Sequence, residues 1–309
     1  MLNKVLSFYT KYFAVWAVVF GVIAYFCPKP FESLKPYMDW FFALTMFGIG
    51  AVLEPVDFQR IVQRPTIVLI GTATQYSIMP ITAYLIGRAF SLDPQITVGL
   101  ILTASAPGAM SSSVMSYIAK ADTAYSASLT VASTLLAPIA TPGLTYLLAQ
   151  SRLDVPFVPM LRDVLLIVIA PLFIGFAARH YLIKKMDKIL PVFPAISATF
   201  IIFICSLVIA LNRNYLANMT GLILAAAVLM NVIGMAGGYI VAYISRMDIR
   251  QRRSLAIEGG MQNAGLGTVI ALKHFSGKAA MPAAIFVFLC IFTASIMAAI
   301  WQRRPAAPQ

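Results

Sequence analysis

Charged side chains are scarce in this chain. Only 11% of its 309 residues are Asp, Glu, Lys or Arg, whereas soluble domains carry about 25%. Hydrophobic residues make up 60% of the sequence and the mean hydropathy is +0.85, so the sequence predicts a polytopic membrane protein instead of a soluble one. At about 20 residues for each helix that crosses a bilayer, the chain has room for about ten spans.

Cysteine and histidine are also rare. Cys27, Cys205 and Cys290 lie far apart, in or beside apolar stretches, so neither a disulfide framework nor a metal-ligand spacing is predicted. His180 and His274 fall at the ends of apolar stretches, with no partner for a proton relay or a metal. The chain also lacks an Asp pair, a His-Glu-x-x-His run and a Ser-His arrangement within its spans. The sequence therefore predicts no enzyme and no catalytic residue.

Apolar runs separated by proline and charged residues mark the predicted spans. Their ranges are 12–27, 37–53, 66–87, 95–118, 123–149, 160–180, 193–211, 219–245, 249–273 and 279–302. Lys and Arg number 23 in the chain, and no basic run is interleaved with aromatic residues, so no nucleic-acid partner is predicted. On this map 15 basic residues lie on one side and 8 on the other. The positive-inside rule places the richer side, and both termini, in the cytoplasm.

Two of the predicted spans are interrupted in the middle. Span 95–118 is broken at Pro107-Gly108, and the three serines at 111–113 follow the break. Span 249–273 is broken at Gly259-Gly260, and the amides at 262–263 follow it. Such residues weaken a helix because proline removes a backbone donor and glycine adds conformational freedom. A proline kink with a small-residue packing face is the competing interpretation of each break.

The two breaks occupy equivalent positions in the two halves of the chain. Sliding one half over the other by 152 positions aligns Gly108 with Gly260 and Ser111 with Asn263. Five spans in each half is an odd number, so the second half must enter the membrane upside down relative to the first. Inverted repeats with one broken helix each point to a transporter site near the bilayer midplane.

Glu258 is the only acidic residue with long apolar stretches on both sides. A carboxylate at the centre of a bilayer costs about 3 kcal/mol on insertion scales, so a cation or a water-filled site must compensate it. Carboxylate, hydroxyl, amide and carbonyl oxygens are the ligands that hard cations prefer. The sequence therefore predicts that Glu258 is the centre of a cation site in a transporter.

Three segments resemble the bile acid:sodium symporter family, and in particular its bacterial members. They are the Glu-Gly-Gly-Met-Gln-Asn run at 258–263, the Ala-Pro-Gly-Ala-Met break at 106–110, and the pair Ser126 and Thr130. The resemblance implies an all-α fold of about ten transmembrane helices in two inverted five-helix repeats, 1–150 and 151–309. It also implies a panel domain of the first, second, sixth and seventh spans, and a core domain of the other six.

The resemblance also implies two sodium sites and a substrate crevice. The first sodium site would use Ser112, Ser113, Ser126, Thr130 and Glu258. The second would use Gln75, Glu258, Gly259, Met261 and Gln262. Asn263 would face the crevice, with Ser111 and Thr293 as further candidates for substrate contact. Ser113 stands where the family usually has Asn, so its hydroxyl would replace an amide in the first site.

Some of these polar residues have simpler alternative roles. Ser126 and Thr130 lie four residues apart on one helix face, and either hydroxyl could bond back to a helix carbonyl. For Gln75, Asn231 and Thr293 the alternative is a hydrogen bond between helices, worth about 1 kcal/mol.

The function implied is sodium-coupled symport of an organic anion, bile-acid-like or pantoate-like, by alternating access. The expected partners are two sodium ions, the small anion and the lipid bilayer, and the expected state is a monomer in a bacterial inner membrane. Two alternatives stay open at this point: a proton-coupled antiporter that uses the buried carboxylate, and an exporter such as those for auxin or arsenite.

Overall fold

The computed structural model describes residues 9, 13–150, 153–181, 189–213 and 216–303, and no strand occurs within these ranges. Their helices are α2 (Phe13–Phe26), α3 (Lys29–Ser33), η1 (Lys35–Tyr37), α4 (Met38–Val52), α5 (Pro55–Gln63), α6 (Pro65–Ala89), α7 (Pro94–Ala104), α8 (Ser111–Ile118), α9 (Thr123–Ala149), α10 (Phe157–Val164), η2 (Leu165–Ile169), α11 (Ala170–Tyr181), η3 (Leu190–Val192), α13 (Phe193–Asn212), α14 (Leu216–Ile244), α15 (Ile249–Gly260), α16 (Ala264–His274) and α17 (Gly277–Gln302). The predicted all-helical class is confirmed for this part of the chain. The ends of the chain, predicted to be cytoplasmic, lie outside it.

Several helices are suited to cross a membrane, which supports a multi-pass protein. Among the described residues, five are long and apolar enough by length and composition. They are Thr123–Ala149, Phe157–Tyr181, Phe193–Asn212, Gly221–Ile244 and Gly277–Gln302. The pair Lys35–Val52 and Pro55–Gln63 would add a sixth span, but it bends by 74°. Pro55 opens the second helix of this pair, as expected for a residue favoured in the first helical turn.

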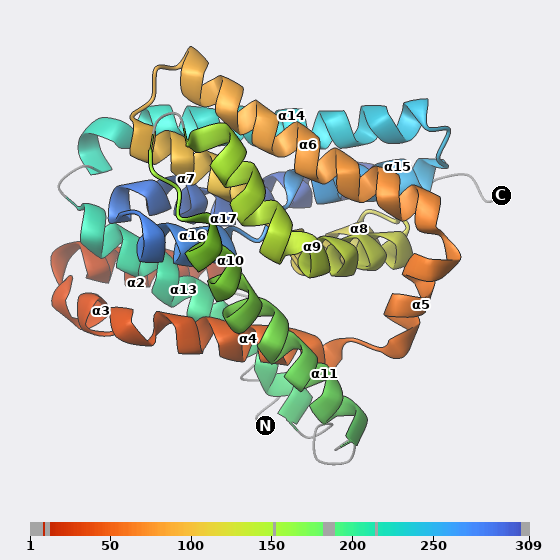
Figure 1. Ribbon diagram of the computed structural model, residues 1–309, viewed down its shortest axis with the longest axis horizontal. Coiled ribbons are helices and arrows are strands. Elements are labelled where there is room, and N and C mark those ends of the chain that lie inside the picture. The colour runs from red at the N-terminus through yellow and green to blue at the C-terminus, as the bar shows by residue number, and fades with distance from the viewer. Residues whose placement is uncertain (1–8, 10–12, 151–152, 182–188, 214–215, 304–309) are drawn as a thin grey trace.

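The helices form two groups that pack against each other. In the first, the α4 group, α4 lies against α11 and α13, and α13 lies against α2. In the second, the α14 group, α6, α7, α8, α9, α14, α15, α16 and α17 pack on one another. The groups meet where α13 contacts α16 and α17, and where α4 contacts α16. Figure 1 shows the α4 group along the lower side of the molecule.

Three helix corners are built in the same way. Each has a residue with a left-handed backbone, then a buried apolar residue, then an aspartate that caps the next helix through its side chain. The three corners are Ser91-Leu92-Asp93, Lys120-Ala121-Asp122 and Arg246-Met247-Asp248. The left-handed residue ends one helix, and the aspartate accepts from the free amides of the next. Consecutive helices are therefore joined by turns of only a few residues.

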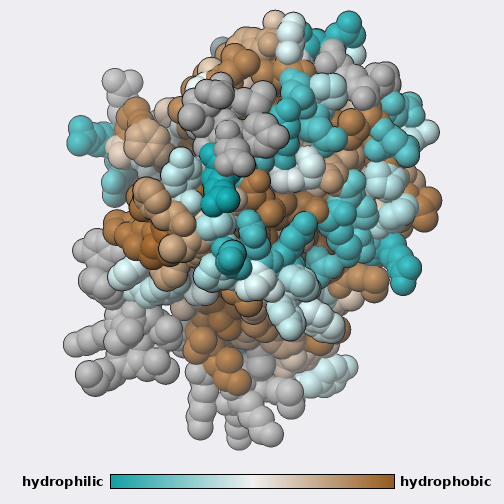
Figure 2. All heavy atoms as spheres, turned by 90° about the vertical axis from the view of Figure 1, so that its left-hand side faces the viewer, coloured by the Kyte–Doolittle hydropathy of each residue, from teal (hydrophilic) through white to brown (hydrophobic). Residues whose placement is uncertain are grey.

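Ion pairs gather at one end of the molecule, where α4 begins, α16 ends and the corner before α7 lies. We call it the Lys273 end, and the opposite end, where α15 begins, the Arg250 end. Figure 2 faces the Lys273 end and shows hydrophilic side chains across the middle of this surface. Here Lys278 of α17 lies 2.7 Å from Asp93, the cap of α7.

The Lys278 contact affects the acid–base behaviour of Asp93. Burial alone raises the pKa of Asp93, but the hydrogen bonds from Lys278 and from the backbone amide of Gln95 hold it below its usual value of 3.8. A carboxylate with a lowered pKa stabilises the fold above its unfolded-state pKa, and this contribution is lost as the pH falls through the folded-state value. The α7–α17 contact is therefore intact at neutral pH.

The crossing of α4 and α11 leaves no room for a side chain at Gly175, and this can be tested. A Cβ atom at Gly175 would collide with the carbonyl of Phe47 and lie 3.0 Å from the amide nitrogen of Ala51. We expect Gly175→Ala to force α4 and α11 apart at a cost of about 1–3 kcal/mol. The measurement is the thermal unfolding midpoint in detergent. At Gly143 the same Cβ would meet its nearest neighbour at 3.8 Å, so an equal loss in Gly143→Ala would contradict this explanation.

Candidate cation site and substrate crevice

The two helix breaks lie side by side and pair with each other through their backbones. Gly108 and Gln262 form an antiparallel bridge. The Ala109 amide donates to the Met261 carbonyl at 3.0 Å, and the Asn263 amide donates to the Pro107 carbonyl at 2.7 Å. An unsatisfied backbone group in a hydrocarbon environment costs several kcal/mol, so each break supplies the partners that the other has lost.

This pairing also defines the register between the two halves. The donors, Ala109 and Asn263, lie 154 positions apart, and so do the acceptors, Pro107 and Met261. The register is therefore two residues longer than the offset of 152 expected from the sequence. The first break spans residues 105–110, between α7 and α8, and the second spans residues 261–263, between α15 and α16.

A crevice of about 210 Å³ adjoins the paired breaks. Ser111 and Asn263 both line it, as predicted for residues that contact a substrate. The Asn263 side-chain oxygen accepts from the Leu266 amide at 3.2 Å and caps α16, so the amide nitrogen is the group left to bind a ligand. The α4 group supplies the opposite wall of the crevice, through Phe42, Thr45, Met46, Ile49, Ser197, Phe200 and Ile201.

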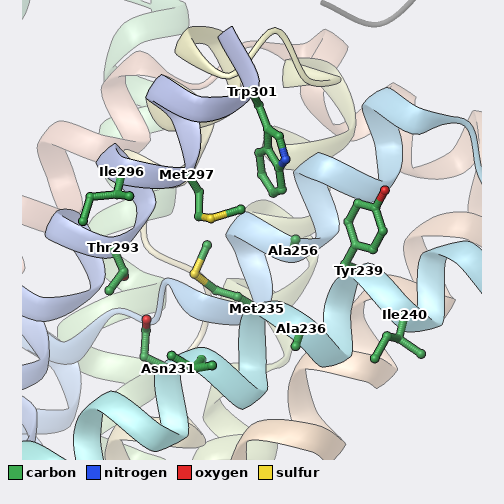
Figure 3. Close-up of a pocket in the computed structure, with 11 residues that line it drawn as sticks. Asn231, Met235, Ala236, Tyr239, Ile240, Ala256, Thr293, Ile296, Met297 and Trp301 are labelled. Carbon is green, nitrogen blue, oxygen red and sulfur yellow. The ribbon is translucent and has the colours of Figure 1, made fainter. Parts of the chain in front are cut away.

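Thr293, the third substrate candidate, lies elsewhere. It lines a separate cavity of about 540 Å³ between α14, α15 and α17, together with Asn231 and Trp301 (Figure 3). Its hydroxyl donates to the carbonyls of Leu289 at 3.0 Å and Cys290 at 3.2 Å, both on its own helix. The structure thus brings Ser111 and Asn263 together in one crevice and places Thr293 in another cavity.

Glu258 is completely buried near the end of α15 and meets three hydroxyl groups. Ser112 and Ser126 donate to its Oε1 atom, and Thr130 lies 3.1 Å from Oε1 and 3.3 Å from Oε2. Ser112 belongs to the first turn of α8, and the other two lie one turn apart on α9. Three of the four hydroxyl residues predicted for the first sodium site therefore converge on the fifth member, the Glu258 carboxylate.

Ser113 remains at the edge of this group. It is half-buried, and its hydroxyl lies 3.5 Å from that of Ser126. Thr130 also makes the alternative contact expected for a helical threonine, because its hydroxyl lies 3.1 Å from the carbonyl of Ser126. A hydroxyl has one proton and two lone pairs, so these groups can turn between donating to Glu258 and binding a cation.

Gln75 and Gln262 form the centre of the second predicted site. The Gln75 amide nitrogen donates to the side-chain oxygen of Gln262 at 2.8 Å, and both residues are 1% exposed. Among the described residues, the Gln75 oxygen finds no hydrogen-bond donor although it is buried. Such an oxygen fits a cation. The Met261 carbonyl already accepts a hydrogen bond from the Ala109 amide. A carbonyl oxygen has two lone pairs, so the second one could bind a cation.

Close packing of α14 brings the backbone of α15 to this site. A Cβ atom at Gly259 would lie 2.5 Å from the carbonyl of Gly234. Asn231 donates to the Gly260 carbonyl at 2.7 Å, which is the bond between helices considered for it from the sequence. Among the described residues, no group of three or more His, Cys, Asp or Glu side chains could hold a metal. The oxygen ligands present suit a hard monovalent cation instead.

Two residues next to Glu258 were not predicted, Ser133 and Gly108. The Ser133 hydroxyl accepts from the Gly108 amide at 3.1 Å and donates to the Thr130 carbonyl at 3.1 Å. Ser126, Thr130 and Ser133 follow the i, i+4, i+7 spacing of one helix face, so this periodicity could have revealed Ser133. The role of Gly108 depends on contacts between distant segments and is visible only in three dimensions.

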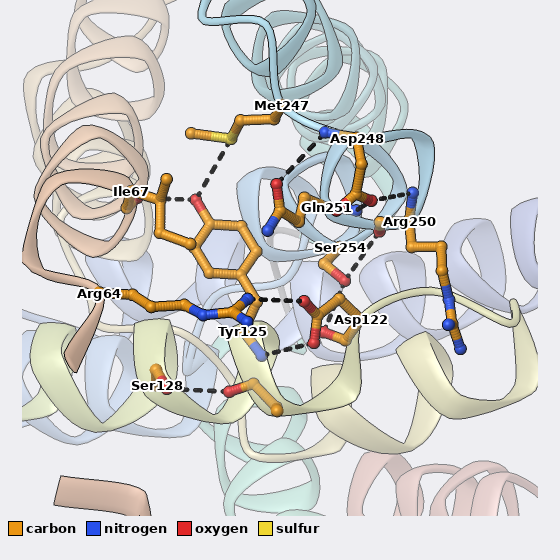
Figure 4. A network of polar contacts seen from close by, with 11 residues as sticks. Arg64, Ile67, Asp122, Tyr125, Ser128, Met247, Asp248, Arg250, Gln251 and Ser254 are labelled. Carbon is orange, nitrogen blue, oxygen red and sulfur yellow. Dashed lines mark hydrogen bonds and ion pairs between the residues drawn. The ribbon is translucent and has the colours of Figure 1, made fainter. Parts of the chain in front are cut away.

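A polar network at the Arg250 end holds α9 and α15 together (Figure 4). The Asp122 amide donates to the Arg250 carbonyl at 3.2 Å, and the Ser254 hydroxyl donates to the Asp122 carbonyl at 2.8 Å. The Asp122 side chain caps α9 by accepting from the Tyr125 amide at 3.0 Å. The helix that carries two of the hydroxyls is thus fixed against the helix that carries Glu258.

The space beside Gly108 gives a test of the site. A Cβ atom there would lie 2.6 Å from Oε2 of Glu258. We expect Gly108→Ala to displace the carboxylate from its hydroxyl partners and to weaken cation binding at least tenfold, which corresponds to about 1.4 kcal/mol. Sodium titrations that follow thermal stability measure this affinity. Gly221→Ala, where no atom lies within 4 Å of the new Cβ, serves as the control, and equal affinities in the two variants would refute the explanation.

Known proteins that resemble this chain are sodium-dependent transporters and cotransporters. The chain is 35% identical to the "Uncharacterized sodium-dependent transporter YocS" of Bacillus subtilis (strain 168), over 98% of this chain and 95% of that one. It is 30% identical to the "Probable sodium/metabolite cotransporter BASS1, chloroplastic" of Arabidopsis thaliana, over 94% of this chain and 73% of that one. It is 27% identical to "Sodium/bile acid cotransporter 4" of Homo sapiens, over 79% and 57%.

A family profile also matches this chain. Residues 40–219 match the Sodium Bile acid symporter family, which is more than half of the chain. This family and the three relatives are transporters, not enzymes. The chain belongs to the sodium bile acid symporter family.

Proposed function

We propose that this protein couples the entry of sodium to the uptake of a small organic anion across a bacterial inner membrane. The observation that carries the proposal is the buried Glu258 carboxylate, surrounded by three hydroxyls next to two paired helix breaks. A charge at this depth needs a compensating cation. Family membership and the sodium-dependent relatives favour sodium as that cation.

We further propose ten spans in two inverted repeats, 1–150 and 151–309. The register of 154 supports this, because it also relates Asp122 to Ser276, the side-chain caps of α9 and α17. A register of 155 relates the corners at Ser91 and Arg246, which share a left-handed backbone. In this scheme α2, α4, α11 and α13 form the panel, and the α14 group forms the core.

Sodium would bind at two places that share Glu258. In the first, Ser112, Ser126 and Thr130 would turn their lone pairs to the ion while the carboxylate supplies the charge, and Ser113 would contribute from the edge. In the second, the unpartnered Gln75 oxygen would join Gln262 and the carbonyls of the α15 end, Gly259 and Met261 among them. Sodium thereby gains oxygen ligands from both breaks and holds them in register.

The anion would bind in the crevice next to these sites. Ser111 lies beside Ser112 at the start of α8, and Asn263 lies beside Gln262 in the second break, so residues that line the crevice adjoin residues of both proposed cation sites. The helices α8 and α16 begin here, and helix N-termini favour negative charge. A ligand that binds the two conformations differently shifts their populations. Sodium would supply that difference as the panel and core rock against each other.

Removal of the Glu258 charge tests the coupling. In proteoliposomes with a sodium gradient, we expect Glu258→Gln to abolish sodium-dependent anion uptake, because both proposed sites lose their charge. Glu32→Gln, at an exposed residue of α3, should retain it. Thermal stabilisation by sodium, measured on the same samples, should disappear only in Glu258→Gln. Uptake in Glu258→Gln that kept wild-type sodium affinity would refute the proposal, and uptake driven by a proton gradient alone would favour a proton-coupled antiporter.

The unequal contacts of the hydroxyls give a second test. Ser126 donates to Glu258, whereas Ser113 reaches only Ser126, at 3.5 Å. A hydrogen bond to a charged group is worth about 1.5–3 kcal/mol, so we expect Ser126→Ala to lower sodium affinity at least about tenfold. Ser113→Ala should change it by less than about threefold. Sodium dependence of the thermal midpoint measures both, and the reverse order of effects would show that Ser113 is the principal ligand.

A further inference from the structure

Lys273 and His274 connect the two helix groups at the Lys273 end. The Lys273 ammonium lies 2.7 Å from Asp39 Oδ2 of α4 and 2.9 Å from Asp163 Oδ1 of α10. His274 Nε2 lies 2.7 Å from Asp163 Oδ2. Two consecutive residues at the end of α16 thus reach a carboxylate on α4 and another on α10, the helix that continues through η2 into α11.

The helix geometry favours these contacts. Lys273 and His274 belong to the last turn of α16, and Asp39 belongs to the first turn of α4. Basic groups are stabilised near a helix C-terminus and acidic groups near an N-terminus. The side chains of Asp163 and His274 are only 15% and 10% exposed, and partly buried pairs are less screened by salt than exposed ones.

Two aromatic rings line the crevice where α4 runs toward the ionic cluster. The rings of Phe42 in α4 and Phe200 in α13 are 5.2 Å apart, and both side chains are buried. Phe42 is the crevice-lining residue of α4 nearest to the Lys273 end. A Cβ atom at Gly265, in the first turn of α16, would lie 3.7 Å from each ring. On α4, Phe42 therefore lies between Asp39 of the ionic cluster and the crevice-lining residues Thr45 and Met46.

We infer that the cluster of Lys273, His274, Asp39 and Asp163 is the gate on one side of the transport cycle. It holds the panel against the core while the crevice is closed toward the Lys273 end, and it must separate when the crevice opens there. This inference rests on the proposed alternating access. Lys273 acts as a positioning residue: it binds no substrate but sets the ratio between the two open states.

The other half of the chain has no equivalent of Asp39 in the proposed repeat. The positions 154 and 155 residues after Asp39 hold Phe193 and Pro194, which carry no charge. A second pair at the same end, Lys278 and Asp93, has the same 2.7 Å distance but joins two helices of the α14 group. This pair offers a matched control, because it has similar exposure and its printed distance joins α17 to the cap of α7, both within the α14 group.

Cys290 is a natural reporter for the experiment. It lines the crevice and is 3% exposed, so it should react with a membrane-impermeant maleimide only when the crevice opens to the side of the reagent. Labelling would use spheroplasts and inside-out vesicles, with Cys27→Ser and Cys205→Ala in the background. Exposed Cys27, kept in a separate sample, identifies the side that the Lys273 end faces.

We expect Lys273→Gln to raise the rate at which Cys290 is labelled by reagent added on the side that the Lys273 end faces. The expected increase is about three- to tenfold, because the variant loses two ion pairs of modest strength. Lys278→Gln should leave the rate unchanged. Lys273→Arg keeps the positive charge and can pair with both carboxylates, so it should keep the low rate of the parent. If Cys290 were labelled at the same rate in Lys273→Gln as in its parent, the proposed gate would be wrong.

A crosslink gives an independent measurement. Cysteines placed at positions 39 and 273 and joined by a short bifunctional methanethiosulfonate, which spans the gap that a direct disulfide could not, should block transport, and reduction should restore it. Transport that continued in the fully crosslinked protein would also overturn the gate. Neither outcome affects the sodium coupling itself, because that is tested by sodium-dependent uptake in the unmodified chain.

Discussion

The structure depends on one constraint: two stretches of non-helical backbone at the centre of the bundle need hydrogen-bond partners for their backbone amides and carbonyls. The breaks at 105–110 and 261–263 meet this constraint by pairing with each other, through the bonds of Ala109 to Met261 and Asn263 to Pro107. Because lipid offers no hydrogen bonds, such a pair is stable only under cover. The helices α9 and α14 provide that cover, and Ser133 and Asn231 bond directly to the breaks.

The pairing is nearly symmetric, but the chemistry is not. The residues 154 positions after Ser126 and Thr130 are Ala280 and Ala284, both buried in α17. One side of the crossing therefore has hydroxyls facing Glu258, while the equivalent helix presents methyl groups. This difference confines the charge to the α9 side and leaves the α17 side to pack against α13. In the proposed repeat, each half supplies one break, and a few differences on one helix would determine where a cation can bind.

The sequence predicted the features that depend on composition and local spacing. Pro107, Gly108 and the glycines after Glu258 marked both breaks, and a lone acid marked the site. It could not predict the side of α17 on which Thr293 lies, because that helix is apolar all round and shows no preferred face. Nor could it reveal the contact of His274 with Asp163, which joins residues 111 positions apart. Contacts of this kind arise only when helices that are distant in sequence pack together.

The short helix α16 connects the two functional regions of the molecule. Its first turn is capped by Asn263, next to Gln262 and the cation site, and its last turn carries Lys273 and His274. Eleven residues of helix span about 16 Å, and nine of them are buried, so neighbouring helices hold α16 along its length. If α16 is displaced as one unit, a shift of the break on sodium binding would reach the ionic cluster without any change inside the helix. The length of α16 thus sets the distance between the proposed ion sites and the proposed gate.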